Sequence, residues 1–105
     1  MGRLRWLGDS QRRVRDFPDT VRAEVGHELW LVECGDEPSD WKPMPSIGAG
    51  AKEIPIRDRE GAFRIIYVAN IEAFVFVLHA FQKKTRTTSA KDIELARARM
   101  KELRR

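Results

Sequence analysis

Apolar residues follow two different periods along this chain, and the change of period divides it into a helical first part and a strand-rich second part. Val21, Val25, Leu29 and Val32 recur every three or four positions, which is the spacing of one face of an α-helix. From residue 52 onward apolar side chains alternate with polar ones or run continuously, which is typical of strands. The pattern therefore predicts a domain that combines helices with a sheet.

Capping and turn residues set the limits of the predicted elements. Asp9 or Ser10 begins a brief helix, Gly35 ends the helix that carries the apolar stripe, and Ser89 opens a terminal helix. The run at 73–78 is apolar on both faces, which predicts a central strand covered on each side. The predicted strands cover 3–7, 52–57, 62–68 and 73–81, and a long Pro- and Gly-rich loop covers 36–50.

The predicted order is therefore β-α-α-β-β-β-α, an α+β fold. The last three strands follow one another through short turns, which predicts an antiparallel meander. We expect a helical layer over one face of a twisted sheet. Pro55 cannot donate to a strand ladder, so its strand is predicted to lie at an edge or to be irregular. Trp30 lies off the helical stripe, and either packs on the sheet, which is commoner, or is exposed as a partner contact.

Positive charge is concentrated in the second half of the chain. The 105 residues carry a net charge of +4 and fit a single domain over residues 1–105. The first 50 residues sum to −2 and the remainder to +6. Such an asymmetry favours a polyanionic partner through counterion release, whereas a solvated basic surface without a partner explains the charge alone equally well.

Several classes of protein are disfavoured by composition. Cys34 is the only cysteine, so no internal disulfide can form, which fits a reducing compartment. The two histidines lie far apart in sequence, and no metal site or cofactor is predicted. No apolar run approaches the length of a membrane span, and no signal peptide is apparent. We expect a cytoplasmic protein without a membrane partner.

The segment that follows the central strand has the strongest functional pattern. Lys83, Lys84 and Arg86 stand among the hydroxyls of Thr85 and its neighbours, and no acidic residue interrupts them. Ammonium, guanidinium and hydroxyl groups all donate to phosphate oxygens, and a strand end holds them near a fixed place. The segment therefore predicts a phosphate-binding rim; the alternative is a solubilising loop.

Three further side chains are candidates for that rim or its support. His79 lies near the end of the same strand and titrates near neutral pH, although a buried histidine satisfied by hydrogen bonds is the more common case. Arg57 ends its strand and is free to reach a substrate. Arg64 shares a face with Ile66 and Val68, which favours a structural role against a carboxylate.

A further pattern is carried by four stretches, Asp40–Gly50, Glu53–Asp58, Phe63–Ala69 and Leu78–Thr85. Their more specific parts are the Phe-Gln-Lys-Lys-Thr ending and an Arg-x-x-Tyr strand. Together these stretches resemble the phage-derived HigB-like branch of the RelE/ParE toxin superfamily, and the similarity runs over nearly the whole chain.

The resemblance implies a RelE-like fold, with two N-terminal helices and a C-terminal helix packed on a small, mainly antiparallel sheet. It implies a type II toxin that is neutralised by a cognate antitoxin, often a helix-turn-helix repressor, in a toxin–antitoxin hetero-oligomer. Many such toxins cut mRNA in the ribosome without metal. The catalytic positions carried over are Arg57, Lys83, Lys84 and, more weakly, His79. The RNA-binding candidates are Lys42, Lys52, Thr85 and Arg86.

The implied reaction is attack of an RNA 2′-hydroxyl on the adjacent phosphate. Arg57 and Lys83 suit stabilisation of the developing charge, and Lys84 or His79 suits proton transfer. Relatives often carry a cation where this chain has Pro55, so a less basic rim is expected. Two other functions stay open: a non-enzymatic poison of DNA gyrase, and an inactive phage-derived binding protein on the same fold.

Overall fold

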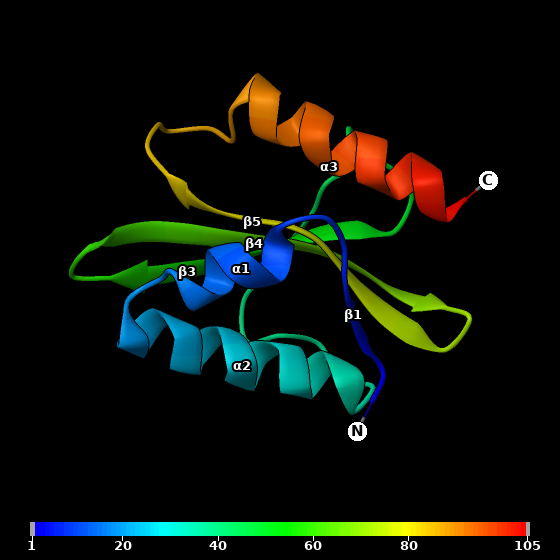
Figure 1. The fold of residues 1–105 in the computed structure, drawn as a ribbon, viewed down its shortest axis with the longest axis horizontal. Helices are drawn as coiled ribbons and strands as arrows, with labels where there is room; N and C mark the ends of the chain where they lie inside the picture. The colour runs from blue at the N-terminus through cyan, green and yellow to red at the C-terminus, as the bar shows by residue number, and fades with distance from the viewer. Residues whose placement is uncertain (1, 105) are drawn as a thin grey trace.

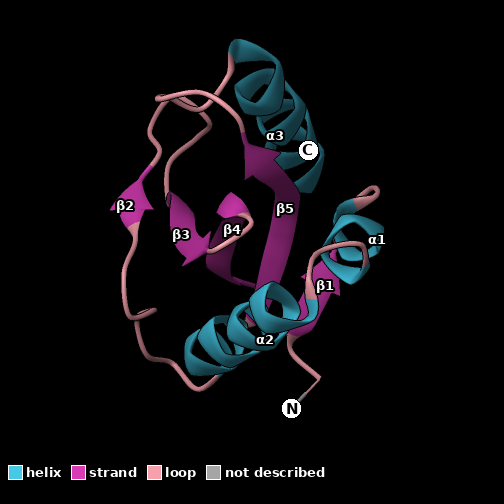
Figure 2. Ribbon diagram, turned by 90° about the vertical axis from the view of Figure 1, so that its left-hand side faces the viewer, coloured by secondary structure: helices cyan, strands magenta, loops and turns pink. Residues whose placement is uncertain are grey.

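Five strands form one mixed sheet in the order β1-β5-β4-β3-β2 (Figures 1 and 2). The computed structural model describes residues 2–104, so the two ends of the predicted domain, residues 1 and 105, lie outside the described residues. β1 pairs with β5 in parallel, and every other neighbouring pair is antiparallel. The strands are β1 (Leu4–Trp6), β2 (Lys42–Pro43), β3 (Ala51–Asp58), β4 (Gly61–Ile71) and β5 (Phe74–Lys83).

Helices cover both faces of this sheet (Figure 1). α1 (Ser10–Arg15) and α2 (Asp19–Glu33) pack on one face, and α3 (Ala90–Leu103) packs on the other. The predicted α+β class and the antiparallel meander β3-β4-β5 are confirmed. The expected placement of all helices on one face is wrong, because β5 is apolar on both sides and a second helical layer is needed to cover it.

The larger core lies between the sheet and the two N-terminal helices. Inward residues of α2 meet alternate residues of β3, β4 and β5, as the predicted stripe requires. Burial of Tyr67 in this core raises the pKa of its phenol. The core residues are Val14, Val21, Val25, Leu29, Val32, Ile54, Ile56, Phe63, Ile65, Tyr67, Val75, Val77 and Ala80.

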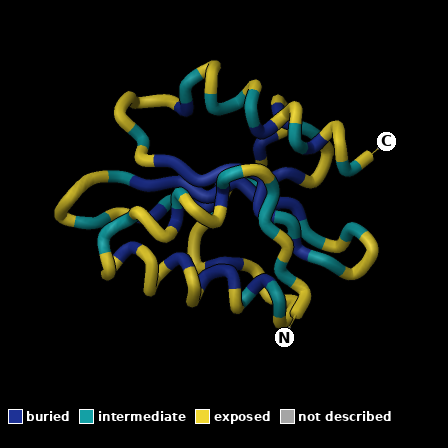
Figure 3. The backbone as a smooth tube through the Cα atoms, viewed as in Figure 1, coloured by how far each residue is buried: buried dark blue, intermediate teal, exposed yellow. Residues whose placement is uncertain are grey.

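A smaller core lies between the opposite face of the sheet and α3. It is closed by Ala96 and Met100 from the helix and by Met44 and Ile47 from the segment before β3. Figure 3 shows the buried strands between exposed helix surfaces and loops. The sheet residues of this core are Ala51, Ile66, Val68, Leu78 and Phe81. The end of the sheet that carries Asp58 and Gly61 lies outside this core.

Several local predictions are confirmed by the element ends. The side chain of Ser89 accepts a hydrogen bond from the backbone N–H of Asp92 and caps α3. Gly35 has a φ of +90° just beyond α2, where a side chain would be strained. β2, which the sequence did not predict, pairs only with Lys52 and Glu53. From Ile54 on, β3 is therefore the sheet edge, as Pro55 predicted.

One clamp joins the helices of the two faces around the β1 side of the sheet. Asp9, at the start of α1, accepts a hydrogen bond from Arg99 of α3 at 2.8 Å and another from Arg13 at 2.9 Å. Arg99 also donates to the carbonyl of Leu78 at 2.8 Å. Hydrogen bonds from Arg99 and Arg13 lower the pKa of the Asp9 carboxyl to about 2, so the clamp stays charged through the physiological range.

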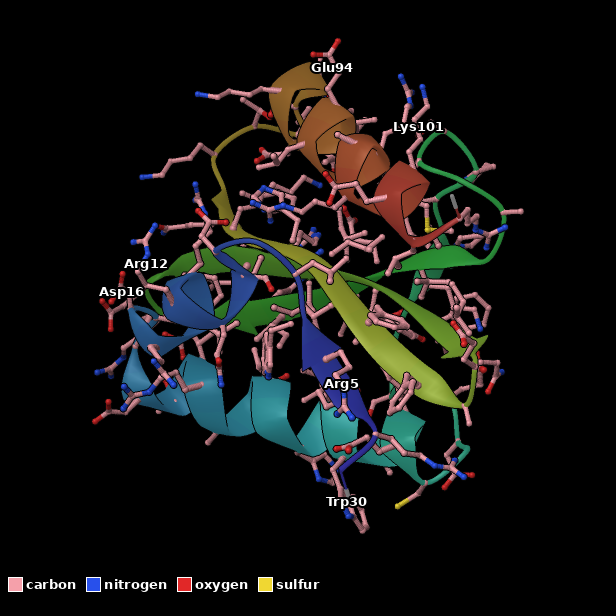
Figure 4. All side chains as sticks on the ribbon, turned by 45° about the vertical axis from the view of Figure 1, so that its right-hand side comes forward. Arg5, Arg12, Asp16, Trp30, Glu94 and Lys101 are labelled. Atoms are coloured by element: carbon pink, nitrogen blue, oxygen red, sulfur yellow. The ribbon has the colours of Figure 1, made fainter. Side chains whose placement is uncertain are left out.

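The α2 surface carries Trp30, the one large hydrophobic side chain that is exposed among residues 2–104, at 49%. Its ring points away from the sheet (Figure 4) and stacks on His27 at a centroid distance of 6.0 Å. The expectation that Trp30 packs on the sheet is wrong, because the inward positions of α2 are filled by its valine and leucine stripe. None of the described helices is long and apolar enough to cross a membrane.

Candidate functional site

Cationic side chains from three neighbouring strands share the α3 side of the sheet. Arg57 of β3 pairs with Ala62 of β4, and Ala62 pairs with Lys83 of β5. Residues in one such row point to the same face, and two strand spacings separate the outer pair by about 10 Å. Arg64 lies two positions along β4 and therefore points to this face as well. The structure thus brings together Arg57 and Lys83, which the sequence could place only on separate strands.

A buried carboxylate lies among these cations. Glu53 of β3 is 0% exposed, and its Oε1 lies 3.3 Å from Arg64 Nε and 3.6 Å from Lys42 Nζ. Its Oε2 accepts a hydrogen bond of 2.6 Å from the hydroxyl of Thr88. The predicted position of Arg64 against a carboxylate is confirmed. Glu53 was not singled out from the sequence. The available signal was its position in the strand: Glu53 shares one face with the apolar residues Ala51 and Pro55, opposite the face of Ile54, so an acidic residue stands where an apolar one is expected.

We call the surface formed by Lys42, Arg57, Arg64 and Lys83 around Glu53 the basic hollow. Its β3 side contains a cavity of about 170 Å³. The residues that line this cavity are Asp40, Trp41, Lys42, Glu53, Pro55, Arg57 and Arg64. A larger cavity of about 370 Å³ lies beside Phe17 and Phe63, but its charged side chains are Asp16 and Glu60. Of these two cavities, the one in the basic hollow is lined by cations and suits a phosphate.

Lys83 is electrostatically unusual within this hollow. Burial lowers the pKa of its ammonium group, and the neighbouring charge of Arg64 lowers it further. Glu53 acts in the opposite direction, while Lys42 and Arg57 add to the lowering. A lysine with a depressed pKa loses its proton more readily than a free lysine and can act as a base. Lys83 therefore lies where a positive charge can stabilise a phosphate, and its lowered pKa also suits proton transfer.

The loop after β5 supplies the remaining predicted residues. Lys83, Lys84, Thr85 and Thr87 line a second cavity of about 150 Å³. The hydroxyl of Thr85 donates to the carbonyl of Thr87 at 2.6 Å, which folds the loop back on itself. Arg86 is exposed at its tip. The contact between Thr88 and Glu53 ties this loop to β3, so the exposed loop lies beside the basic hollow.

His79 lies on the same face of the sheet but does not reach the hollow. It is 0% exposed, its Nε2 lies 2.7 Å from Asp92 Oδ1, and its ring stacks on Phe81 at 5.0 Å. Burial lowers the pKa of the imidazole, against the opposing effect of Asp92. The ring is enclosed by β5 and α3 and cannot touch a substrate, so the structure does not support the expected role of His79 in proton transfer.

Lys52 is the other predicted residue that the structure places elsewhere. It pairs with Tyr67 in the sheet and therefore points to the α2 side. Its ammonium group contacts Glu37 at 3.1 Å and lies 4.3 Å from the ring centre of Trp41. These partners hold it away from Arg57 and Lys83. Among residues 2–104, no cluster of three or more histidine, cysteine or acidic side chains is arranged to bind a metal ion.

The arrangement defines a class: a small α+β domain whose sheet presents converging cations on one partly uncovered face. Residues 12–101 match the family described as phage derived protein Gp49-like (DUF891), and the chain belongs to this family. No curated protein matches the chain.

Proposed function

We propose that this protein is the toxin of a type II toxin–antitoxin system and that it cleaves mRNA on the ribosome. The observation that carries the proposal is the convergence of Arg57, Arg64 and Lys83 from three strands on one face. Guanidinium and ammonium groups gathered on one face suit the phosphate oxygens of an RNA backbone. The Gp49-like family is associated with RelE/HigB-like toxins, which supports the toxin class.

The side chains of the hollow suit the attack of a 2′-hydroxyl on the adjacent phosphorus. Lys83 in its neutral form accepts the hydroxyl proton while the 2′-oxygen bonds to phosphorus. Arg57 and Arg64 stabilise the extra negative charge on the phosphate oxygens. Lys84 donates a proton to the 5′-oxygen as the bond between it and phosphorus breaks. The products are a 2′,3′-cyclic phosphate and a free 5′-hydroxyl, so atoms and protons balance.

The test is cleavage in a reconstituted translation reaction, with the message mapped by primer extension. The wild-type protein should produce cuts within translated codons. Lys83→Ala should reduce the cleavage rate by about 100- to 1000-fold, the usual cost of losing one group that acts on the transition state. Lys101→Ala, on the exposed surface of α3 (Figure 4), is the matched control and should cleave normally.

Substitution by arginine separates the two possible roles of Lys83. Lys83→Arg keeps a positive charge but cannot lose its proton in the accessible pH range. If Lys83 accepts the proton, Lys83→Arg should be as inactive as Lys83→Ala. If it only stabilises charge, Lys83→Arg should retain most activity. Absence of cuts with the wild-type protein, accompanied by DNA damage in cells, would contradict the nuclease and favour a gyrase poison.

The proposal includes a protein partner. A toxin of this class is neutralised by a cognate antitoxin, which we expect to be a helix-turn-helix repressor encoded beside it. Co-expression of the two should restore growth and yield a hetero-oligomer on copurification. Growth arrest that persists when the neighbouring gene is co-expressed would contradict this assignment of the partner without affecting the test of cleavage.

A further inference from the structure

We propose that Glu53 is a positioning residue of the basic hollow: its buried carboxylate fixes Arg64 and Lys42 and, through Thr88, the loop that follows Lys83. This inference rests on the proposed function and names the residue that organises its site. The assignment is based on three contacts of one side chain, each to a different segment of the chain.

The first argument is the cost of burying this carboxylate. A charged group removed from water is expensive unless partners compensate it, and an apolar residue of similar volume often stabilises a fold at least as well. Glu53 is fully buried, and its Oε1 and Arg64 Nε lack a hydrogen bond of good geometry although they lie 3.3 Å apart. A contribution to stability therefore explains poorly why a glutamate is buried at this position. Its contacts with Arg64, Lys42 and Thr88 explain its presence directly.

The second argument is that each contact of Glu53 fixes one part of the hollow. Arg64 belongs to β4, in the floor of the hollow, and is only 8% exposed. Lys42 belongs to the short edge strand β2, which is paired to β3 over two residues only. Thr88 ends the loop that begins at Lys84, and is itself buried. One carboxylate thus joins the floor, the edge strand and the loop.

The third argument is electrostatic. Arg57, Arg64, Lys42 and Lys83 repel one another across a short distance, and Glu53 is the buried negative charge among them. Its charge opposes the lowering of the Lys83 pKa that the arginines and Lys42 produce. Removal of the charge should therefore shift the titration of Lys83 to lower pH. A residue that only fills space would not produce such a shift.

The experiment compares Glu53→Gln, Glu53→Asp and Thr88→Val with two matched controls. Glu53→Gln removes the charge but keeps an oxygen that can accept from Thr88, and Thr88→Val removes the hydroxyl that ties the loop. Glu94→Gln on the exposed face of α3 (Figure 4) and Thr20→Val are the controls. Thr20 donates to Asp58 at 2.8 Å, so its substitution removes a similar bond outside the hollow.

Three readouts are measured: the NMR titration of the Lys83 ammonium group, amide hydrogen exchange over residues 84–89, and mRNA cleavage. Glu53→Gln should shift the Lys83 titration to lower pH, and Glu53→Asp should restore it. Thr88→Val should accelerate exchange in the loop. Both variants should lower the cleavage rate by about 10- to 100-fold, as small displacements of catalytic groups do, and the controls should change none of these quantities.

The outcomes separate the two proposals. Absence of cleavage by the wild-type protein would overturn the proposed nuclease, while titration and exchange would still test the positioning role. An unchanged Lys83 titration in Glu53→Gln, or unchanged loop exchange in Thr88→Val, would overturn that role. If Glu53→Gln does not fold, Thr88→Val decides alone: accelerated exchange with a folded core supports the inference, and exchange equal to that of Thr20→Val contradicts it.

Discussion

The two faces of strands β3, β4 and β5 are formed by alternate residues of the same segments, yet they have different compositions. Under α2 the core of the face is apolar, from Ile54 and Ile56 on β3 to Ala80 on β5, and Lys52 lies at its margin. Under α3 the face is apolar toward one end of the strands and charged toward the other, where Glu53, Arg57 and Lys83 lie. A sheet can thus hold its structural core and its reactive groups in one set of strands.

The difference follows from where the helices begin and end. α2 supplies buried residues along most of its 15 positions, from Val21 to Val32. α3 begins only at Ala90, after the chain has left β5 at Lys83 and formed an exposed loop. On the part of the sheet that α3 does not cover, Lys42 and Arg57 are exposed and stay hydrated, whereas Arg64 and Glu53 are buried and lie against each other. An incomplete helical cover is therefore what makes the basic hollow possible.

The largest expected effect concerns the face of the sheet that α2 covers. Ile65→Ala removes a side chain that is 0% exposed beneath α2 and should lower the free energy of unfolding by about 2–5 kcal/mol. Urea denaturation followed by circular dichroism measures the change. A loss below 1 kcal/mol would show that this face is loosely packed, and the contrast between the two faces would disappear.

The next effect concerns the face that carries the basic hollow. It should appear in the rate of mRNA cleavage rather than in the free energy of unfolding. Arg57 is exposed at the edge of the hollow, so Arg57→Ala should change the free energy of unfolding by less than about 0.5 kcal/mol. Its cleavage rate should fall by about 100-fold, because a charge that stabilises the transition state is lost. Arg59→Ala, exposed in the adjacent turn, is the control. Comparable loss of activity in both variants would point to general charge rather than to the hollow.

The smallest effect concerns the clamp that links the two faces. The pKa of Asp9 is about 2 in the folded protein, below its ordinary value of 3.8. This difference stabilises the fold above pH 3.8, and the contribution is lost as the pH falls toward 2. Asp9→Asn should reduce the free energy of unfolding at pH 7 by about 2 kcal/mol and flatten its dependence between pH 4 and 2. If the free energy of unfolding of Asp9→Asn depended on pH between 4 and 2 as it does in the wild-type protein, a role of the Asp9–Arg99 ion pair in stabilising the fold would be contradicted.

The sequence predicts most of the fold because its strongest periodic patterns coincide with real elements. The α2 stripe, the central strand at β5 and the cap at Ser89 are all local signals. The pattern did not show that α3 lies on the opposite face, since helix placement depends on which side of the sheet the chain returns to. β2 was missed because its two residues, Lys42 and Pro43, carry no strand periodicity and pair only through tertiary contact.

The candidate site was less predictable than the fold. The cations Arg57 and Lys83 could be selected by their positions at strand ends, but their shared row depends on the register of three strands. Glu53 was missed because its importance comes from Arg64 and Thr88, which lie 11 and 35 positions away in the chain. His79 and Lys52 were selected by residue type. Burial under α3 keeps His79 away from the hollow, and Lys52 points to the opposite face of the sheet.

The most direct test of the central claim is an NMR titration with a short oligoribonucleotide whose 2′-hydroxyls are methylated, so that it binds without being cut. At low salt, the largest shifts should occur at Arg57, Arg64 and Lys83, with further shifts over residues 84–88. The surface of α2 around Trp30 should remain unchanged. Shifts centred on α2, or shifts spread evenly over all exposed cations, would contradict an RNA site on the α3 side of the sheet.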